Sequence, residues 1–233
     1  MNVITSSEPL SPTSRTVIHR GAAHAVAERD AMLEVLRLGL VAHVGFSGGT
    51  HPVVLPMAYA VDPVGPDRDG TLYLHGSVAA AMLRPGTKQT MCATITLLDG
   101  LVAARSGFHH SMNYRCVVVI GAARRVTDAD ERGHALDLIV DQMLPGRSGL
   151  VRAPTRKELA ATAVLGIPLH EASLKTRAGG PVDDPADANE AIWAGHIPLS
   201  LAYGDAITDP GCVSPIPDHV AAVSPTRGQP EPG

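Results

Sequence analysis

The sequence predicts a mainly β protein, built as a β barrel with helices appended to it. Short runs of β-branched and apolar residues recur along the first two thirds of the chain, separated by Gly, Pro and Asp turn signals. Segments with helical periodicity occur singly and do not alternate with these runs, which argues against a doubly wound parallel sheet. The chain has neither Gly-x-Gly-x-x-Gly after a strand nor Gly-x-x-x-x-Gly-Lys-Ser/Thr, so the two common nucleotide-binding motifs are excluded.

The first elements follow from composition and spacing. Residues 1–20 are rich in Ser, Thr and Pro and are predicted to form a flexible arm. Apolar residues at helical spacing then predict a helix over residues 22–37, which Gly39 ends. Residues 40–46 and 52–61 are predicted strands, joined by a glycine-containing turn at residues 47–50.

The remaining elements are read in the same way. Further strands are expected at residues 71–75, 91–97, 101–106, 114–126 and 167–174, with a short helical piece at 77–83. Capping boxes at residues 127–130 and 155–158 open two helices that run to about residues 144 and 165. The Pro-rich segment 209–233 is expected to be disordered, which leaves residues 21–208 as one folded domain.

Composition excludes several classes of function. The chain is 45% hydrophobic and 18% charged, with a net charge of −4 and no block of Lys or Arg, so neither a nucleic-acid surface nor an anionic-membrane surface is expected. No apolar run approaches the ~18 residues of a membrane span. The N-terminus does not resemble a secretory signal, and three widely spaced cysteines fit a reducing compartment. A cytoplasmic location is therefore expected.

One polar segment, residues 107–115, lies between two apolar strands and is the first candidate for a functional site. Strands fix the positions of side chains carried on the loop between them. Its two adjacent imidazoles, amide, phenol and guanidinium, together with Arg105, suit an anionic, hydrogen-bonding ligand. No metal site is expected, because no Cys, Asp or Glu accompanies His109 and His110 at ligand spacing.

A series of motifs carries a family resemblance. Two of them are Leu72-Tyr-Leu-His-Gly-Ser77 and Phe108-His-His-Ser-Met-Asn-Tyr-Arg115, and the others are at residues 43–46, 52–56, 98–106, 145–147, 158–162, 171–175 and 193–195. In this order they resemble the pyridoxamine 5'-phosphate oxidase-like flavin-nucleotide-binding proteins, the FMN-binding split barrels. Within that family the chain is most similar to the branch related to nitroimidazole-resistance proteins.

The resemblance implies a six-stranded split β barrel that forms a homodimer, with FMN in the clefts between protomers. It also implies an FMN-dependent oxidoreductase that moves two electrons to or from a small, planar, electron-poor substrate such as a nitroaromatic, quinone or pyridine derivative. His75 matches an active-site histidine of the nitroimidazole-resistance relatives, so it is the expected catalytic residue and proton donor.

The resemblance and the polar segment together give the expected cofactor-binding residues: His75, Gly76, Ser77, Arg84, Lys88, Arg105, Ser106, His109, His110, Asn113, Tyr114 and Arg115. One departure concerns the flavin phosphate. Family members carry a Ser-Arg pair where this chain has Ala80 and Ala81, so Ser77, Arg84 or Lys88 is expected to take over that role. A surface ion pair is the alternative role for Arg105.

Two other functions stay open at this point. A haem-binding split barrel would use His75, His109 or His110 as axial ligand, and the missing phosphate pair favours it. A non-catalytic flavin-binding or regulatory protein is the third hypothesis. FAD or deazaflavin could replace FMN in any of these. Trp193, the single tryptophan, is expected to close the barrel, and Arg177 is expected to form ion pairs in the acidic loop that follows it.

Overall fold

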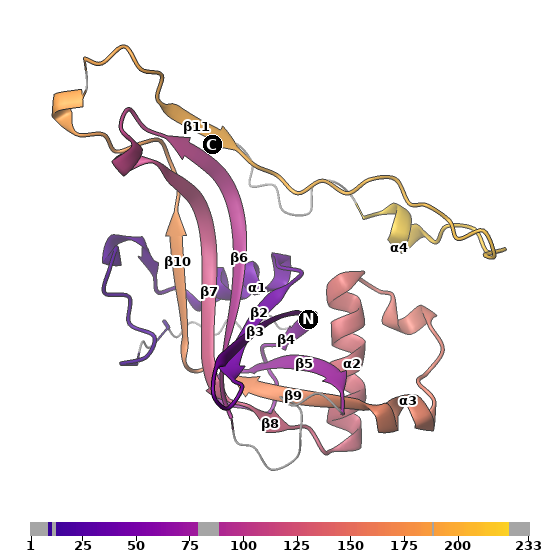
Figure 1. Cartoon of the computed structure of the whole chain (residues 1–233). Helices are drawn as coiled ribbons and strands as arrows, with labels where there is room; N and C mark the ends of the chain where they lie inside the picture. Colours follow the sequence, from indigo (N-terminus) through magenta and orange to yellow (C-terminus); the bar gives the residue numbers. More distant parts are fainter. Residues whose placement is uncertain (1–8, 11–12, 79–88, 188, 224–233) are drawn as a thin grey trace.

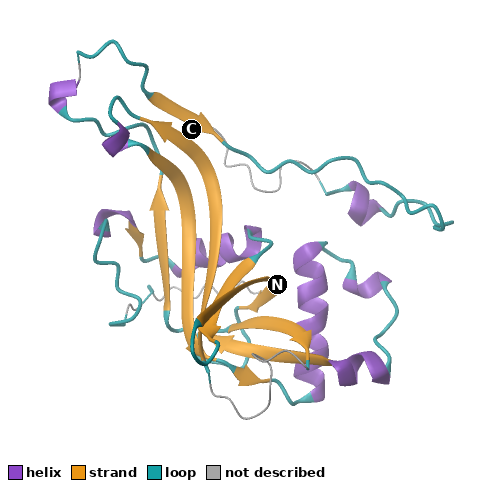
Figure 2. Ribbon diagram, viewed as in Figure 1, coloured by secondary structure: helices purple, strands orange, loops and turns teal. Residues whose placement is uncertain are grey.

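The computed structural model describes residues 9–10, 13–78, 89–187 and 189–223, which form two antiparallel sheets with helices packed against them (Figures 1 and 2). In spatial order, the larger sheet contains β1 (Ala25–Val26), β10 (Ala172–Arg177), β7 (Ser111–Ala122), β6 (Thr90–Ala103), β2 (Ala42–Ser47) and β3 (Pro52–Met57), with β11 (Gly195–Pro198) also paired to β6. The smaller sheet contains β4 (Tyr59–Asp62), β5 (Thr71–Ser77), β9 (Thr162–Pro168) and β8 (Arg124–Arg125).

The two sheets enclose one main core, which makes the protein a split barrel with appended helices and confirms the predicted fold class. Ile95 and Val117 from the larger sheet and Leu72 from the smaller one are all fully buried in it. The chain passes from one sheet to the other at sharp bends. At one of them a single residue, Ala58, separates β3 from β4. The predicted single strand over residues 52–61 is therefore wrong: its halves pair in different sheets.

Three further strand predictions differ from the structure. The predicted strand over residues 114–126 is wrong, because it is divided between β7 and β8, which lie in different sheets. The predicted strand over residues 167–174 is wrong, because its two parts belong to β9 and β10, which lie in different sheets. The predicted strands at residues 91–97 and 101–106 are one continuous strand, β6, with a bulge between Leu98 and Gly100. The extra residue of the bulge, Asp99, is free to turn its carboxylate to Arg115 of β7. β6 and β7 thereby form a long ribbon that projects from the barrel (Figure 2).

The first helix, α1 (Arg29–Leu38), is shorter than predicted. Residues 22–28 are not α-helical: Ala22–His24 form a short 3₁₀ helix, and Ala25–Val26 pair with β10 as β1. The predicted end at Gly39 is confirmed. The hydroxyl of buried Tyr59 donates to the carbonyl oxygens of Leu36 and Gly39, and so satisfies two acceptors that a helix end leaves without partners.

The second helix, α2 (Ala129–Met143), covers the outer face of the smaller sheet, where Ala135 and Ile139 pack with Tyr73 and Val164. Its N-cap is Asp128, one residue after the predicted position, because the Asp128 carboxylate accepts the N–H of Glu131.

The helix after it, α3 (Arg156–Ala161), has the predicted capping box between Thr155 and Glu158. It ends well before residue 165, because residues 162–168 are apolar and pair with β5 as β9. Short helical turns complete the chain: Gly107–His109, Ser148–Leu150, Pro185–Asp187 and α4 (Asp218–Ala221).

The two ends of the described chain differ in how closely they pack against the barrel. The predicted flexible arm is not free where it is described, since Leu10 is buried in the main core and both Thr13 and Arg15 bind the carboxylate of Glu171. Residues 199–223, in contrast, run away from the barrel as an extended and largely exposed segment (Figure 1). Across the described ranges, no helix combines the length and the apolar character needed to cross a membrane.

Candidate functional site

His75 lies near the end of β5, opposite Val164 of β9, on the face of the smaller sheet that carries Tyr73. Strand alternation sends its neighbours Leu72 and Leu74 into the main core instead. The imidazole is half-buried and makes no hydrogen bond or ion pair with any described residue. Burial lowers its pKa, since desolvation penalises the charged ring, so the neutral form is favoured.

The segment after His75 is only partly described. Gly76 and Ser77 end β5, and Ser77 has an interaction partner. Ala80, Ala81, Arg84 and Lys88, which the resemblance relates to the flavin phosphate, lie outside the described residues, as does most of the predicted helical piece at 77–83.

The polar segment forms the tip of the ribbon, between the end of β6 and the start of β7. Its two histidines have different surroundings. The Nδ1 of His110 lies 2.9 Å from the carbonyl oxygen of Ser106, so this ring caps the turn. His109 meets the ring of Phe108 edge to face, with 5.1 Å between centroids, and that phenyl ring is 90% exposed. An exposed aromatic side chain at a hairpin tip is available for contact with another molecule.

The guanidinium groups near the ribbon tip are paired with acceptors of the same chain. The backbone N–H and Nη1 of Arg105 donate to Asp183 at 2.9 and 2.6 Å, and Arg115 makes two hydrogen bonds to Asp99, at 2.8 and 3.0 Å. The pKa of the Asp183 carboxyl falls, first because of the backbone N–H of Arg105 and then because of its guanidinium. Arg105 therefore takes the surface ion pair that was its alternative role.

Asn113 belongs to the same hydrogen-bonded unit. Its amide donates to the carbonyl of Gly179 at 3.1 Å, and its oxygen accepts from Arg177 at 2.5 Å. Arg177 also donates to the carbonyl of Gly180, so it binds an amide and backbone carbonyls here and not the acidic loop. Tyr114 is half-buried and lies opposite Arg177 in the sheet. These contacts tie the loop after β10 to the ribbon.

A single copy of the chain does not bring all the predicted site residues together. His75, Gly76 and Ser77 lie in the smaller sheet, while Arg105, Ser106, His109 and His110 lie at the far tip of the ribbon (Figure 1). Asn113, Tyr114 and Arg115 follow along β7. The sequence motifs thus mark two separate regions of one protomer.

A cavity of about 550 Å³ opens at the edge of β6, and sequence reasoning did not find it. β2 pairs with this edge at residues 92–94 and β11 pairs with it at residues 100–103, which leaves a gap in the sheet between them. Most of the lining is aliphatic, and the polar groups include the Arg115–Asp99 pair. The lining residues are Leu38, Gly39, Leu40, Val41, His43, Thr96, Leu97, Leu98, Asp99, Arg115, Leu199, Ser200 and Leu201.

Sequence reasoning missed this cavity because it depends on which strands neighbour β6. The one signal in the sequence was the pair Leu199 and Leu201, two large apolar residues that follow the last predicted structural element. An aliphatic wall beside the paired Arg115 and Asp99 suits a small planar molecule that carries a polar group.

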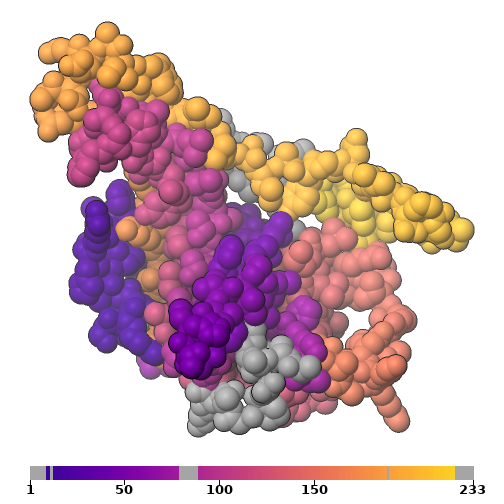
Figure 3. All heavy atoms as spheres, in the orientation of Figure 1, coloured from indigo at the N-terminus to yellow at the C-terminus, as the bar shows by residue number. Residues whose placement is uncertain are grey.

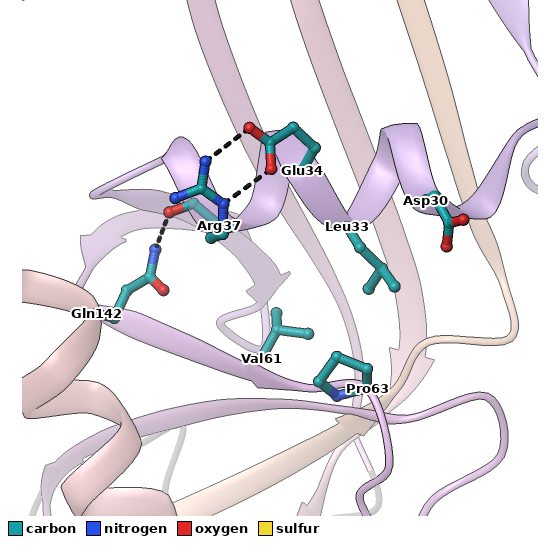
Figure 4. A pocket seen from close by; sticks show the side chains of 7 residues that line it. All are labelled: Asp30, Leu33, Glu34, Arg37, Val61, Pro63 and Gln142. Atoms are coloured by element: carbon teal, nitrogen blue, oxygen red, sulfur yellow. Dashed lines mark hydrogen bonds and ion pairs between the residues drawn. The ribbon is translucent and has the colours of Figure 1, made fainter. Parts of the chain in front are cut away.

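A second, smaller pocket of about 250 Å³ lies between α1 and α2 (Figure 4). The carboxylate of Glu34 binds Arg37 at 2.7 and 2.8 Å, and this pairing lowers the pKa of the Glu34 carboxyl. Gln142 of α2 donates its amide to the carbonyls of Leu36, Arg37 and Gly39. Because these side chains satisfy one another, the pocket is best understood as the junction that fastens α2 to the end of α1.

Comparison with known proteins gives consistent matches. The sequence profile of the family described as pyridoxamine 5'-phosphate oxidase matches residues 28–176. The structure of the flavocytochrome Anf3 from Azotobacter vinelandii is 32% identical and has a TM-score of 0.83, covering 91% of this chain and 98% of that one. The structure of the FAD and heme binding protein from Mycobacterium smegmatis is also 32% identical, with a TM-score of 0.77, covering 86% of this chain and 97% of the other.

A more distant structure shares the fold alone. It is named as a candidate 5-nitroimidazole antibiotic resistance protein from Bacteroides thetaiotaomicron, with 20% identity, a TM-score of 0.51 and coverage of 65% of this chain and 85% of that one. Among curated proteins, none matches this chain. The profile match spans more than half of the sequence, and the two structures at 32% identity span nearly all of it. The chain therefore belongs to the pyridoxamine 5'-phosphate oxidase-like family of split-barrel proteins.

Proposed function

We propose that this protein binds a flavin and a haem and acts in electron transfer. The proposal is supported by the two relatives at 32% identity, one named a flavocytochrome and the other an FAD and heme binding protein. When bound, a flavin supplies one- and two-electron chemistry and a haem supplies one-electron chemistry, while the protein binds and orients them. FAD is the flavin that the second relative's name supports, and FMN and deazaflavin are the alternatives.

The state of His75 carries the proposal. An axial ligand must offer the lone pair of a neutral imidazole nitrogen to the iron. The ring of His75 is half-buried, is free of hydrogen bonds within the described ranges, and has a lowered pKa, so it is neutral near pH 7. His110 donates its Nδ1–H to the Ser106 carbonyl, which leaves its other ring nitrogen able to bind iron, so it is the alternative ligand. A neutral imidazole is also a poor proton donor, which favours iron ligation over the general-acid role expected from the resemblance.

The two separated regions would form one site only if two copies of the chain combine. We therefore include a homodimer in the proposal, with Gly76 and Ser77 of one copy and the ribbon residues Ser106 and Tyr114 of the other as flavin contacts. The outer face of the larger sheet supports this arrangement. Among its side chains, Val54 and Leu98 are exposed, and Cys92, Cys116 and Ile120 are half-buried. An apolar sheet face of this kind is typical of a subunit interface.

The absorbance spectrum of the purified protein, with the released chromophores identified by mass, tests the proposal directly. We expect oxidised-flavin bands together with a Soret band, and a flavin mass that distinguishes FAD, FMN and deazaflavin. A protein that carries neither group, and takes up neither added flavin nor added haem, would refute the proposal.

Replacement of the proposed ligand gives a sharper test. In His75→Ala we expect loss of the Soret band with the flavin bands retained. The matched control is His51→Ala, which changes an exposed histidine in the β2–β3 turn and should keep both sets of bands. Circular dichroism of both variants confirms that they fold. A Soret band that survives in His75→Ala would assign the iron to another ligand.

The cavity beside β6 favours a second candidate function, the flavin-dependent reduction of a small, planar, electron-poor molecule such as a quinone or nitroaromatic. Its aliphatic lining and the adjacent Arg115 suit such a substrate. The test is anaerobic mixing of the reduced flavoprotein with a quinone or a nitroaromatic. Reoxidation faster than that of the same free flavin would support this function, and equal rates would exclude it.

A further inference from the structure

The C-terminal arm, residues 200–223, leaves the barrel without polar attachment to it. The last hydrogen bond to the barrel is at Leu199, whose N–H donates to the carbonyl of Asp99 at 3.0 Å. Beyond this point, every hydrogen bond found in the described chain joins two arm residues, as between Cys212 and Asp209 or between Val220 and Pro217. Figures 1 and 3 show the arm running outward past α2.

The arm carries apolar side chains that this protomer does not cover. Ile207 is 96% exposed and Val213 is fully exposed, and Leu201 and Ile216 are also exposed. An extended segment must lose conformational entropy to become ordered, and burial of such side chains is the usual compensation. The arm is therefore shaped for contact with a surface outside its own barrel.

At least part of the segment after residue 199 is shared with the flavocytochrome at 32% identity. The family profile ends at residue 176, yet the alignment with the flavocytochrome covers 91% of the chain. That alignment omits too few residues to leave out the whole segment after residue 199. The more distant structure, in contrast, covers only 65% of the chain. A segment that aligns in part with a relative at 32% identity is a feature common to both chains and not a random tail.

Charge indicates what the arm meets. It contains Asp205, Asp209 and Asp218 but no Lys or Arg. On the barrel, Arg20, His24 and Lys175 gather beside β1 and form what we term the basic ledge. The Lys175 ammonium donates to the carbonyl of Arg20 at 2.9 Å, and it lies with the His24 ring around Gly21, where an added Cβ would be 3.2 Å from the Lys175 nitrogen and 3.5 Å from the His24 ring.

A protomer's own ledge is in the wrong place for its arm. In Figure 1 the indigo segment that carries the ledge lies on the side of the barrel away from the direction in which the arm runs. The arm is long enough to cross a neighbouring molecule, because an extended chain spans about 3.3 Å per residue, or ~80 Å in all. A folded body of about 200 residues has a radius of gyration of only about 16 Å.

We infer that the C-terminal arm docks on a second copy of this chain and runs along its larger sheet toward the basic ledge. The two arms exchange reciprocally, which gives a closed two-fold dimer. The inference concerns the polypeptide alone and holds whether or not a flavin or haem is bound.

The first test uses Ile207→Asp combined with Val213→Asp. Both side chains are exposed in the protomer, so the double variant should keep the circular dichroism of the wild type. Dimer dissociation, measured by sedimentation velocity over a concentration series, should become about tenfold or more easier, because two apolar contacts are lost. The control is Val64→Asp, which changes a 75% exposed valine in the β4–β5 loop and should leave dimerisation unchanged. Equal dissociation constants for the wild type and the double variant would overturn the inference.

A second test locates the arm. Native Cys212 is exposed on it and can carry a maleimide photocrosslinker, with Cys212→Ser as the control. Unlabelled and ¹⁵N-labelled proteins are mixed, allowed to exchange and irradiated. We expect crosslinked peptide pairs of mixed isotope that join the arm to residues 15–27 or 172–177. Pairs of a single isotope only would show that the arm folds onto its own chain, and would refute the exchange.

Discussion

The carboxylate of Asp183 accepts two hydrogen bonds from a single residue, Arg105, one from its backbone N–H at 2.9 Å and one from its guanidinium at 2.6 Å. The two residues lie 78 positions apart in the sequence. This contact closes the loop after β10 over the end of β6, next to the place where β11 pairs with the same strand. The ribbon tip is therefore held by the loop that follows β10 as well as by its own turn.

Replacing Asp183 by Asn should make the ribbon tip and β11 open more often. The variant keeps the shape of the side chain but loses the ion pair, so we expect amide hydrogen exchange in β11 and in residues 104–110 to become severalfold faster. Exchange in β5 and β9 should not change. Glu190→Gln, which removes an exposed carboxylate in the same loop, is the control. Unchanged exchange in β11 would show that the loop is held by its other contacts alone.

Tyr73 should make stability sensitive to alkaline pH. Its buried hydroxyl donates to Glu131 of α2 at 3.0 Å, and burial, followed by this bond, raises the pKa of Tyr73 to about 12. Because the folded state holds the proton more tightly than the unfolded state, stability is complete below pH 10 and falls as the pH rises from 10 to about 12.

The variant Tyr73→Phe removes this effect. We expect it to cost about 1 kcal/mol at pH 7 through the lost hydrogen bond. It should also flatten the decline in stability above pH 10, measured by urea unfolding at a series of pH values. Tyr203→Phe, on the C-terminal arm, is the control and should keep the decline. A variant with the wild-type slope would assign the alkaline sensitivity to other groups.

His75 should make the stability of the fold sensitive to acidic pH. Its folded-state pKa lies below the usual 6.5, so in mildly acidic solution the unfolded chain binds a proton that the folded protein does not. Stability is therefore complete above about pH 6.5 and falls as the pH drops toward the folded-state value. In cofactor-free protein, His75→Gln should reduce this decline while His51→Gln keeps it, as measured by denaturant midpoints between pH 5 and 7.5. Identical slopes in both variants would contradict the burial of His75.

Two glycine-to-alanine replacements should change the stability of the protein in opposite directions. A Cβ at Gly39 would overlap the Ile95 side chain and the Tyr59 hydroxyl, so Gly39→Ala should destabilise the protein by roughly 1–3 kcal/mol. Gly133 lies inside α2 with open space around it, and Gly133→Ala should stabilise by about 0.5–1 kcal/mol through helix propensity. Thermal and urea unfolding measure both changes. A neutral Gly39→Ala would mean that the end of α1 can move away from Tyr59.

Local signals in the sequence found the elements whose causes are local. The capping box at Thr155 and Glu158, the helix end at Gly39 and the hairpin turn between β2 and β3 all depend on neighbouring residues. Their chemistry is visible in a short window of sequence. The series of motifs, above all Phe108–Arg115, likewise predicted the fold family correctly.

Features that depend on tertiary partners were not predictable in this way. Residues 52–61 have the composition of one strand, and only the pairing of each half shows that the chain changes sheets at Ala58. Residues 22–28 have helical spacing, but part of this segment pairs with β10 as strand β1. The acceptors of Arg105 and Arg115 are Asp183 and Asp99, whose roles depend on a loop after β10 and on a bulge in β6. The sequence identified the donors but not the groups that hold them.

The pairing of β1 with β10 has a consequence for how the protein is made. It joins Ala25 and Val26 to Lys175 and Leu174, residues separated by most of the folded domain. During synthesis the edge of the larger sheet stays open until the ribosome has released β10, and contacts between such distant segments form slowly. Until then the apolar faces of β6 and β7 are exposed in the nascent chain, so the interval before β10 emerges is when we expect chaperones to act on this protein.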